Sequence, residues 1–323
     1  MENINVLSLF DGISCGQIAL ERTGIKVNNY FASEIDKYAI QVTQHNYPNT
    51  KHIGDVTKVN GNDLPKTDLL IGGSPCTNFS VAGNQEGLNV DNVSLDSLQK
   101  YIKLKNSGFV FKGQSYLFWE YVRILKEKNP KYFLLENVKM NKKWENMISN
   151  ELGVDAIKIN SALVSGQNRE RLYWTNIPNI TIPNDKKIKL KDILINDVDD
   201  KFYLNDKQIE KAKYLKGKKE INRIKNGFEY TYKEGGMSFP NDLNKKSNCL
   251  LASGQPIART STYVEDSKGI RRITPNECEI LQTVPLDYTS MVSDAQRYKM
   301  LGNGWTVDVI VHIFKQLLIN NNN

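Results

Sequence analysis

The chain has 323 residues, of which 43 are Lys or Arg and 36 are Asp or Glu, so its formal net charge is +7. This length can bury a sizeable core in one large domain or two smaller ones, and the ordinary apolar and charged fractions exclude wholesale disorder. No apolar run reaches membrane-spanning length, and no basic segment leads into an apolar one at the N-terminus. We therefore expect a cytoplasmic protein without a membrane segment.

Cysteine and histidine are sparse and scattered. The four cysteines form no CxxC pair, and the three histidines show no metal-ligand spacing. This pattern argues against a zinc site or a disulfide framework, fits a reducing cytoplasm, and predicts no bound metal. The positive net charge suggests a polyanionic partner, but an AT-rich genome would produce the same excess of lysine.

Strand and helix signals alternate along the first half of the chain. Short apolar runs predict strands at 4–10, 28–34, 68–73 and 132–138, with a shorter one at 52–55. Apolar residues at helical spacing predict helices at 18–24, 35–47 and 116–128. Alternation of this kind favours an α/β fold with a parallel, doubly wound sheet.

Two later segments depart from this alternation. Residues 178–270 are lysine-rich and carry most of the excess positive charge. We interpret them as a basic nucleic-acid face, the alternative being the solvated surface of a helical insert. Residues 89–113 are long for a strand-to-helix connection, and long connections in compact domains often act as functional lids. The last segment, 306–319, has helical periodicity and is expected to pack back on the first domain.

The ends of the first three expected strands carry residues suited to a nucleoside. Gly12 and Gly16 follow the first strand, where glycine lets the backbone approach a ligand, although their spacing is not the dinucleotide fingerprint. Glu34 ends the second strand, where a carboxylate can accept hydrogen bonds from a ribose diol. Asp55 follows the third and can accept from an adenine amino group. The alternative for each carboxylate alone is an exposed surface side chain.

The next two strand ends carry a thiol and a carboxyl group. Cys76 follows the apolar run 69–71 and a Ser-Pro turn, and Glu136 lies near the end of the strand at 132–138. A thiolate is a nucleophile, and a neighbouring carboxyl group can hold or donate a proton. Without a histidine, this pair suits conjugate addition to an electron-poor ring rather than proteolysis. The alternative is that Cys76 is a small buried apolar residue.

The segment 166–174 presents alternating polar side chains. On an extended chain Gln167, Arg169 and Arg171 point to one side and Glu170 to the other. A cation directed into a cleft would stabilise charge that develops on the ring. The alternative is a surface strand with a salt-bridged Arg–Glu pair.

In their order and spacing, these motifs resemble the cytosine-5 DNA methyltransferase family along nearly the whole chain. The matching segments are FDG with Gly16, Glu34, Asp55, Pro75-Cys76, ENV at 136–138, QNRER at 167–171, RRITPNECEILQTVPLDY at 271–288 and LGNGWTVDVI at 301–310. The pattern is of bacterial or phage type, while SLFDG and GGSPC are similar to the animal de novo enzymes. Gly304 replaces the family's usual serine, and GQSYLFW lacks the usual Arg-Gly.

The resemblance implies a Rossmann-like, doubly wound, S-adenosylmethionine-dependent methyltransferase domain plus a smaller target-recognition domain. The catalytic domain would comprise residues 1–177 and 271–323, with the C-terminal helix returning to it. The target-recognition domain would comprise residues 178–270.

The resemblance also implies a set of site residues. The catalytic residues would be Cys76, Glu136, Arg169 and Arg171. The cofactor-binding residues would be Phe10, Asp11, Gly12, Gly16, Glu34, Ile35, Asp55, Val56, Pro75, Leu117, Asn303 and Trp305. The DNA-binding residues would be Ser80, Gly83, Asn84 and Gln85 in a loop that closes over DNA, then Gln167, Ser253 and Arg259, the last as a reader of guanine.

The activity implied is methyl transfer from S-adenosylmethionine to C5 of a flipped-out cytosine in a short duplex sequence. Cys76 would add to C6, and Glu136 would hold the N3/N4 edge and supply a proton. Arg169 would contact the O2 side of the ring, and Arg171 would support the site.

We expect double-stranded DNA as the partner, no metal, and a monomer that serves restriction-modification or phage and mobile-element protection. A cognate restriction endonuclease, if there is one, would act separately. The alternatives are a tRNA cytosine-5 methyltransferase of the same family and a catalytically silent DNA-binding regulator. A nicotinamide oxidoreductase is disfavoured because the dinucleotide fingerprint is absent.

Overall fold

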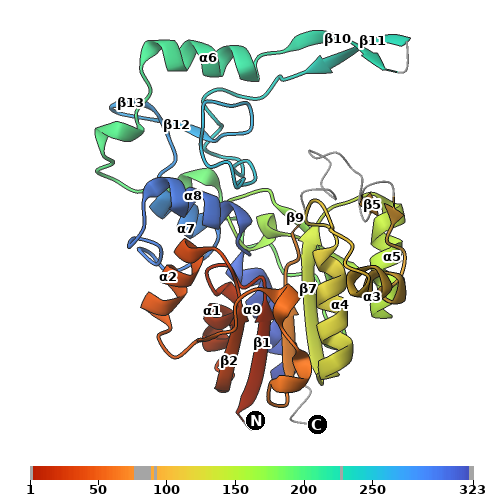
Figure 1. The fold of residues 1–323 in the computed structure, drawn as a ribbon. Coiled ribbons are helices and arrows are strands. Elements are labelled where there is room, and N and C mark those ends of the chain that lie inside the picture. The colour runs from red at the N-terminus through yellow and green to blue at the C-terminus, as the bar shows by residue number, and fades with distance from the viewer. Residues whose placement is uncertain (1–2, 76–88, 91–92, 226–227, 320–323) are drawn as a thin grey trace. The chain divides into compact units, whose positions relative to one another are not determined.

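The computed structural model describes residues 3–75, 89–90, 93–225 and 228–319 (Figure 1). The chain divides into two compact units, which we describe separately. The first unit comprises Met1–Asn160, Glu170–Pro183 and Val307–Asn323, and the second comprises Ser161–Arg169 and Asn184–Thr306.

The described part of the first unit is built on a seven-stranded sheet in the order β3-β2-β1-β4-β7-β9-β8. Neighbouring strands pair in parallel except at β9, which runs antiparallel to both β7 and β8. The strands are β1 (Ile4–Leu9), β2 (Val27–Ser33), β3 (Lys51–His52), β4 (Leu69–Gly72), β7 (Tyr132–Val138), β8 (Ile157–Asn160) and β9 (Glu170–Thr175). The predicted α/β fold is confirmed, and the sheet, which was predicted to be parallel, is parallel except at β9.

Helices cover both faces of this sheet because its central strands carry apolar side chains on both sides. Leu70 belongs to a core shared with α4 (Leu117–Lys128) and α5 (Lys142–Leu152). Ile71 points to the opposite face, where α1 (Cys15–Thr23) approaches very closely. A Cβ on Gly16 would lie only 2.4 Å from Cδ1 of Ile71. Packing of α1 on the sheet therefore requires a glycine at this position.

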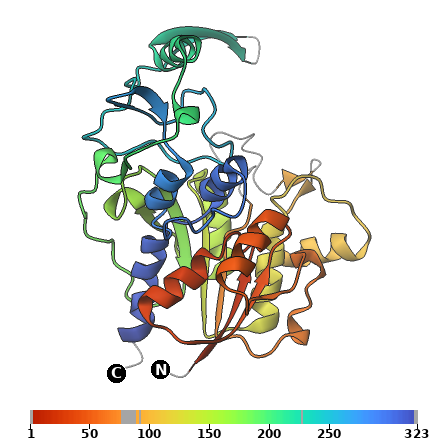
Figure 2. The same ribbon diagram turned by 90° about the vertical axis from the view of Figure 1, so that its left-hand side faces the viewer.

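The last helix, α9 (Val307–Ile319), returns to the first unit, as expected. It packs against α1, and Figures 1 and 2 show the two helices side by side. Ile310, Ile313 and Phe314 are completely buried. Arg22 of α1 forms an ion pair with Asp308 of α9 at 2.9 Å. α2 (Lys37–Asn46) follows β2.

Residues 89–113, expected to be a long loop, contain regular structure. A short antiparallel pair is followed by a helix, and these elements are β5 (Asn89–Val90), β6 (Val93–Ser94) and α3 (Leu98–Asn106). Ser97 caps this helix, because its hydroxyl oxygen accepts a hydrogen bond from a backbone N–H of the first turn. The helix buries Tyr101. This helix was not predicted, because the few apolar residues of LQKYIKLKN alternate with lysines over little more than two turns.

The second unit combines short helices with antiparallel strand pairs. β10 pairs with β11 and β12 with β13, and Figure 1 shows α6 leading into the first of these pairs. The elements are η3 (Ser161–Leu163), η4 (Leu190–Ile193), η5 (Asp200–Phe202), α6 (Asp206–Lys216), β10 (Lys219–Lys225), β11 (Phe228–Glu234), β12 (Tyr263–Asp266), β13 (Gly269–Arg272), α7 (Pro275–Leu281) and α8 (Asp294–Asn303). The lysine-rich region is thus a mixed structure and not a purely helical insert.

The division by contacts differs from the predicted functional domains in three segments: 161–169 belongs to the second unit, 178–183 belongs to the first, and the largest difference concerns 271–306. We predicted that residues 271–323 rejoin the catalytic domain, whereas contacts place the chain up to Thr306 in the second unit. The physical reason is the start of α7, where Arg271 pairs with Glu277 at 2.8 Å. The amide of Ile195 also donates to Glu277, at 3.1 Å, so this part of the chain is tied to the second unit. The assignment of 178–270 as a target-recognition domain stays a prediction.

A lysine lies inside the second unit at the end of α6. Lys216 is completely buried, its ammonium donates to Oδ1 of Asn241 at 2.8 Å, and its nitrogen lies 5.0 Å from the centroid of the Tyr263 ring. Burial lowers the pKa of Lys216 from 10.5 to about 8. The folded protein therefore releases this proton at a lower pH than the unfolded chain does.

We expect Lys216→Met to remove a pH dependence of stability. Because the unfolded chain keeps the proton between about pH 8 and 10.5, the free energy of unfolding should rise with pH across this window. The difference in pKa corresponds to at most roughly 3 kcal/mol. Urea denaturation at neutral and alkaline pH should show this gain for the wild type and for Lys211→Met, an exposed change on the same helix. An equal gain in Lys216→Met would contradict the prediction.

Candidate active site

A tight turn after β1 gathers predicted cofactor residues at the end of the sheet. Phe10 and Gly12 have φ of 58° and Ser14 has φ of 57°, so the backbone turns sharply between β1 and α1. The Asp11 carboxylate accepts hydrogen bonds from the Tyr30 hydroxyl at 2.7 Å and from the Ser14 hydroxyl. Burial raises the pKa of Asp11 to about 6 in spite of these bonds.

Glu34 is held in place by backbone amides where β2 ends. Its Oε2 accepts from the amide of Gly12 at 2.8 Å, and its Oε1 accepts from the amides of Ile35 and Asp36 at 2.7 and 2.8 Å. Carboxylate oxygens have further lone pairs. The oriented carboxylate can therefore still accept hydrogen bonds from a ribose diol.

The surroundings of Glu34 fit a nucleoside. A Cβ built on Gly12 would meet nothing within 4 Å, so there is open space beside the carboxylate. Ile35 is 72 % exposed and offers an apolar surface for a base. Asp55 caps η1 (Val56–Lys58), where its carboxylate accepts from the amide of Thr57 at 2.9 Å. Two fixed carboxylates beside an apolar surface suit the adenosine part of S-adenosylmethionine.

The other predicted cofactor residues fall in both units. Val56 is buried, and Pro75 and Leu117 are half-buried in the first unit. Asn303 is exposed and Trp305 is half-buried, and both belong to the second unit. Their cofactor contacts stay predictions.

β7 and β9 place a carboxylate beside a guanidinium. Their antiparallel register pairs Val138 with Arg171, so the side chains of Arg171 and Glu136 lie on the same face of the sheet. Nε of Arg171 is 3.1 Å from Oε1 of Glu136, and both side chains are largely buried. A carboxylate in such an ion pair is fixed in position.

The end of β7 also holds the segment that leads to the predicted nucleophile. Nδ2 of Asn137 donates to the carbonyl oxygen of Ser74 at 3.2 Å and to its Oγ at 3.1 Å. Asn137 thereby fixes the backbone two residues before Cys76. Cys76 itself and the predicted DNA-contacting residues Ser80, Gly83, Asn84 and Gln85 lie outside the described residues.

The alternative for QNRER was a salt bridge between an arginine and a glutamate of this segment, but the ion pairs join each of them to residues elsewhere in the chain. Glu170 pairs with Lys139 at 2.9 Å and with Lys158 at 3.7 Å. The carboxylate beside Arg171 comes instead from Glu136 on the neighbouring strand. Arg171 therefore forms a largely buried ion pair with Glu136, and Glu170 forms ion pairs with two exposed lysines.

Arg169 lies in the second unit and is buried there. Its Nη1 donates to the carbonyl of Leu250 at 3.0 Å and contacts Sγ of Cys249 at 3.4 Å. Its Nη2 donates to the carbonyls of Gly302 at 3.2 Å and Gly304 at 2.9 Å. This placement differs from the predicted contact with a cytosine ring, because the guanidinium is engaged by backbone acceptors of its own unit.

Gln167, predicted to contact DNA, is completely buried in the second unit. Its Nε2 donates at 2.8 Å to the carbonyl of Leu281 and at 2.8 Å to Oε1 of Gln282. Its Oε1 accepts from the amide of Leu250 at 3.3 Å. Both ends of the side-chain amide therefore serve internal packing in place of the predicted DNA contact.

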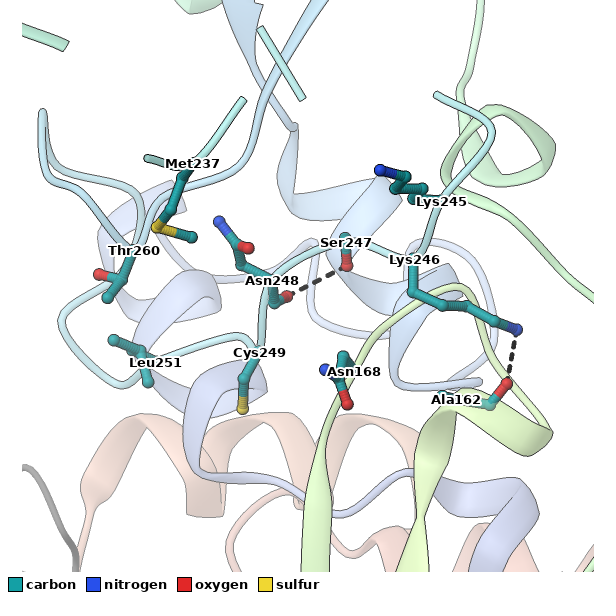
Figure 3. Close-up of a pocket in the computed structure, with 10 residues that line it drawn as sticks. All are labelled: Ala162, Asn168, Met237, Lys245, Lys246, Ser247, Asn248, Cys249, Leu251 and Thr260. Atoms are coloured by element: carbon teal, nitrogen blue, oxygen red, sulfur yellow. Dashed lines mark hydrogen bonds between the residues drawn. The ribbon is translucent and has the colours of Figure 1, made fainter. Parts of the chain in front are cut away.

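A cavity of about 590 Å³ opens in the second unit (Figure 3). Its lining mixes polar and basic residues with apolar surface and consists of Ala162, Asn168, Met237, Lys245, Lys246, Ser247, Asn248, Cys249, Leu251 and Thr260. Lys246 reaches across to donate to the carbonyl of Ala162 at 2.5 Å and to that of Ser165 at 3.1 Å. The predicted DNA residues Ser253, which is exposed, and Arg259, which is half-buried, are not among the lining residues.

Sequence reasoning did not single out Asn168 or Lys245, Lys246 and Asn248 of this cavity. The signal was present as the polar run KKSN directly before the segment 249–263 that resembled the family's recognition segment. Asn137 was quoted only as part of ENV, and its contact with Ser74 required the fold.

Among the described residues, no three His, Cys, Asp or Glu side chains are grouped as a metal site would need. Within the same residues, no helix combines the length and apolar character needed to span a bilayer.

Comparisons with known proteins agree with this architecture. Residues 4–318 match the C-5 cytosine-specific DNA methylase family. The type II methyltransferase M1.ScrFI of Lactococcus lactis subsp. cremoris is 31% identical over 97% of this chain and 77% of its own. The type II methyltransferase M.NlaX of Neisseria lactamica is 30% identical over 97% of this chain and 95% of its own.

Among solved structures, the Entamoeba histolytica methyltransferase EhMeth superposes with a TM-score of 0.71 at 16% identity, covering 100% of both chains. This likeness supports the fold alone, whereas the sequence match extends over nearly the whole chain. The chain therefore belongs to the C-5 cytosine-specific DNA methylase family.

Proposed function

We propose that the protein is an S-adenosylmethionine-dependent DNA methyltransferase that modifies C5 of a flipped-out cytosine in a short duplex sequence. The observation that carries this proposal is the Glu136–Arg171 pair next to the Asn137–Ser74 contact. Together they provide a fixed acid beside the strand end that leads to Cys76. Membership of the family supports the same class of reaction.

The chemistry needs a nucleophile and an acid because C5 of cytosine is too weak a nucleophile on its own. The Cys76 thiolate adds to C6, which forms an S–C6 bond and moves ring electrons toward C5. Glu136 holds a proton at N3, so the ring can accept these electrons. S-adenosylmethionine, when bound, supplies the electrophilic methyl group for C5. Loss of the C5 proton then expels the Cys76 thiolate and restores the ring.

The two arginines exchange the roles that the sequence alone predicted. Arg171 orients Glu136 and brings a positive charge to the side of the ring where negative charge develops. Arg169 fixes the carbonyls of Gly302 and Gly304, on either side of the predicted cofactor residue Asn303.

Double-stranded DNA is the proposed partner, and the base must leave the stack before attack, at a cost of about a few kcal/mol. The cavity of the second unit suits DNA strand contacts because Lys245 and the amides of Asn168 and Asn248 can donate to phosphate oxygens. The names of the type II relatives favour DNA over tRNA and a role in restriction-modification. A cytoplasmic monomer is part of the same proposal.

A base-resolution map of 5-methylcytosine tests this function. DNA and tRNA from the same cells are compared before and after induction of the wild-type gene. The proposal expects new methylation at every copy of one short DNA sequence and none in tRNA. Methylation confined to tRNA would assign the RNA reaction. Folded protein without methylation of either would identify a silent binder and overturn the proposal.

A further inference from the structure

A buried carboxylate in α4 takes no part in the proposed chemistry. Glu120 is completely buried, and its carboxylate accepts hydrogen bonds from a hydroxyl, an ammonium and a guanidinium group. Its Oε1 accepts from the Tyr101 hydroxyl and from Nζ of Lys105, and its Oε2 accepts from Nε and Nη2 of Arg123 at 2.8 and 2.6 Å. One anion thus holds two cations, one from its own helix and one from α3.

Both cations reach beyond Glu120 to the turn that begins at Asp55. Nζ of Lys105 donates to the carbonyl of Thr57 at 3.0 Å. Nη2 of Arg123 donates to the carbonyls of Val56 at 3.1 Å and Val59 at 2.8 Å. The carbonyls of Thr57 and Val59 lie at the end of the turn, where carbonyls lack partners within the turn and attract cations, whereas that of Val56 also accepts from the amide of Val59 at 3.2 Å. Asp55 caps the other end of η1, so the two cations fix the turn that carries this carboxylate.

Ring contacts also join the segment 89–113 to Tyr116 at the start of α4. Aromatic rings tie this segment to the start of α4, with centroids 5.0 Å apart for Tyr101–Phe111 and 4.9 Å apart for Phe111–Tyr116. Burial and, after it, the carboxylate of Asp55 raise the pKa of the Tyr116 phenol. The negative charge of Asp55 therefore acts on the phenol of Tyr116.

Lys105 is the member of this cluster that can be changed with little risk to the fold. Its side chain is 33% exposed, whereas that of Glu120 is 0% exposed and that of Arg123 is 13% exposed. The rest of the connection has separate anchors, since Lys128 donates to the carbonyls of Gly61 and Leu64 at 2.9 and 2.7 Å. Removal of the Lys105 ammonium would therefore loosen the Asp55 end of the connection and leave its other end held.

We propose that Lys105 is a positioning residue for the cofactor, and that α3 thereby sets how well the site recognises adenine. Lys105 acts through the Thr57 carbonyl on η1, and η1 aims the Asp55 carboxylate at the adenine amino group. This inference rests on the proposed function, in which Asp55 accepts a hydrogen bond from that group.

Calorimetric titration with two ligands tests this role. S-adenosylhomocysteine carries the amino donor at C6 of its base, and S-inosylhomocysteine carries an oxygen acceptor there. The wild type should prefer the adenosyl ligand by about tenfold or more, because a carboxylate facing the oxygen loses its hydrogen bond. Lys105→Met should reduce this preference by about fivefold through weaker adenosyl binding. Lys105→Arg should restore it, and Lys103→Met, an exposed change on the same helix, should match the wild type.

Kinetics provide an independent readout. Lys105→Met should raise KM for the cofactor and leave kcat at saturation within about twofold, because the reacting atoms are not touched. The inference would be overturned if the ratio of the dissociation constants for the two ligands were the same in Lys105→Met as in Lys103→Met. Equal weakening of both ligands would also overturn it, since it indicates only a structural role. Should Lys105→Met not fold, Lys105→Gln is held to the same expectations.

Failure of the proposed function would look different. Wild-type protein that binds no S-adenosylhomocysteine would overturn the proposed cofactor and the inference with it. Wild-type protein that binds both ligands equally would remove Asp55 from adenine recognition, which also overturns the role of Lys105. Discrimination by the wild type that persists unchanged in Lys105→Met leaves the proposed function intact and removes the inference alone.

Discussion

Glu136→Gln is expected to lower kcat for methyl transfer to DNA by about 10²- to 10⁴-fold, the usual contribution of a general acid or base. Glutamine has nearly the same shape and can still accept a hydrogen bond from Arg171. It cannot supply the proton that N3 needs when the thiolate adds to C6. The dissociation constant for S-adenosylhomocysteine should stay within about twofold, because the proposed contacts of that ligand are Glu34 and Asp55, at other strand ends.

Single-turnover transfer from labelled S-adenosylmethionine to genomic DNA measures the rate. Cys76→Ser supplies the reference for complete loss of the covalent step. Glu170→Gln is the matched control, because it makes the same acid-to-amide change on the neighbouring strand, where Glu170 forms ion pairs with Lys139 and Lys158. A Glu136→Gln rate close to that of Glu170→Gln would remove Glu136 from the chemistry.

Glu277→Gln is expected to lower the free energy of unfolding of the second unit by about 3–5 kcal/mol. Glu277 is completely buried and binds Arg271, which is 1% exposed, through Nη2–Oε1 at 2.8 Å and Nη1–Oε2 at 2.9 Å. Its oxygens also accept from the amides of Thr274 at 2.7 Å and Ile195 at 3.1 Å. Glutamine would remove one of the two carboxylates that compensate the buried guanidinium, leaving Asp266 at 2.8 Å, and could not accept all four bonds.

Hydrogen–deuterium exchange in increasing urea can follow peptides from 184–306 separately from those of the first unit. Glu220→Gln is the control, because Glu220 forms an exposed pair with Lys233 at 3.6 Å, and its loss should hardly move the transition. The double change Arg271→Met with Glu277→Gln should recover part of the loss, since it removes the buried cation that has lost one of its two carboxylate partners. A midpoint unchanged in Glu277→Gln would show that the pair contributes little.

The sheet of the first unit could be predicted because its strands are buried on both faces. Such strands appear as continuous apolar runs, of which Leu69–Gly72 is a short example with every residue buried. The hairpin β10–β11 was not predicted, although FEYTYKE alternates aromatic and polar residues and Asn226-Gly227 is a dipeptide common in hairpin sequences. The density of charge in this region obscured the alternation.

The candidate site was predictable in its residues and less so in their contacts. Motif spacing pointed to Glu136, Arg169 and Arg171, and side-chain alternation predicted that the two arginines point to one side of an extended segment, which stays a prediction. Their partners come from distant parts of the chain, since Arg169 contacts residues 80–135 positions away. Alternation along a strand predicts on which side a side chain lies but not which residues it contacts, so the partners of Arg169 and Arg171 could be identified only from the fold.

The packing of α9 on α1 has a consequence for the order in which the protein can mature during translation. Between the last residue of α1 and the first residue of α9 a ribosome adds the 283 residues 24–306, which takes roughly 15 to 60 s at common rates of synthesis. During that time the side of α1 that packs against α9 has no partner helix, and all residues of the second unit are made before α9 begins. The first unit can therefore complete its packing only after the second unit has been synthesised.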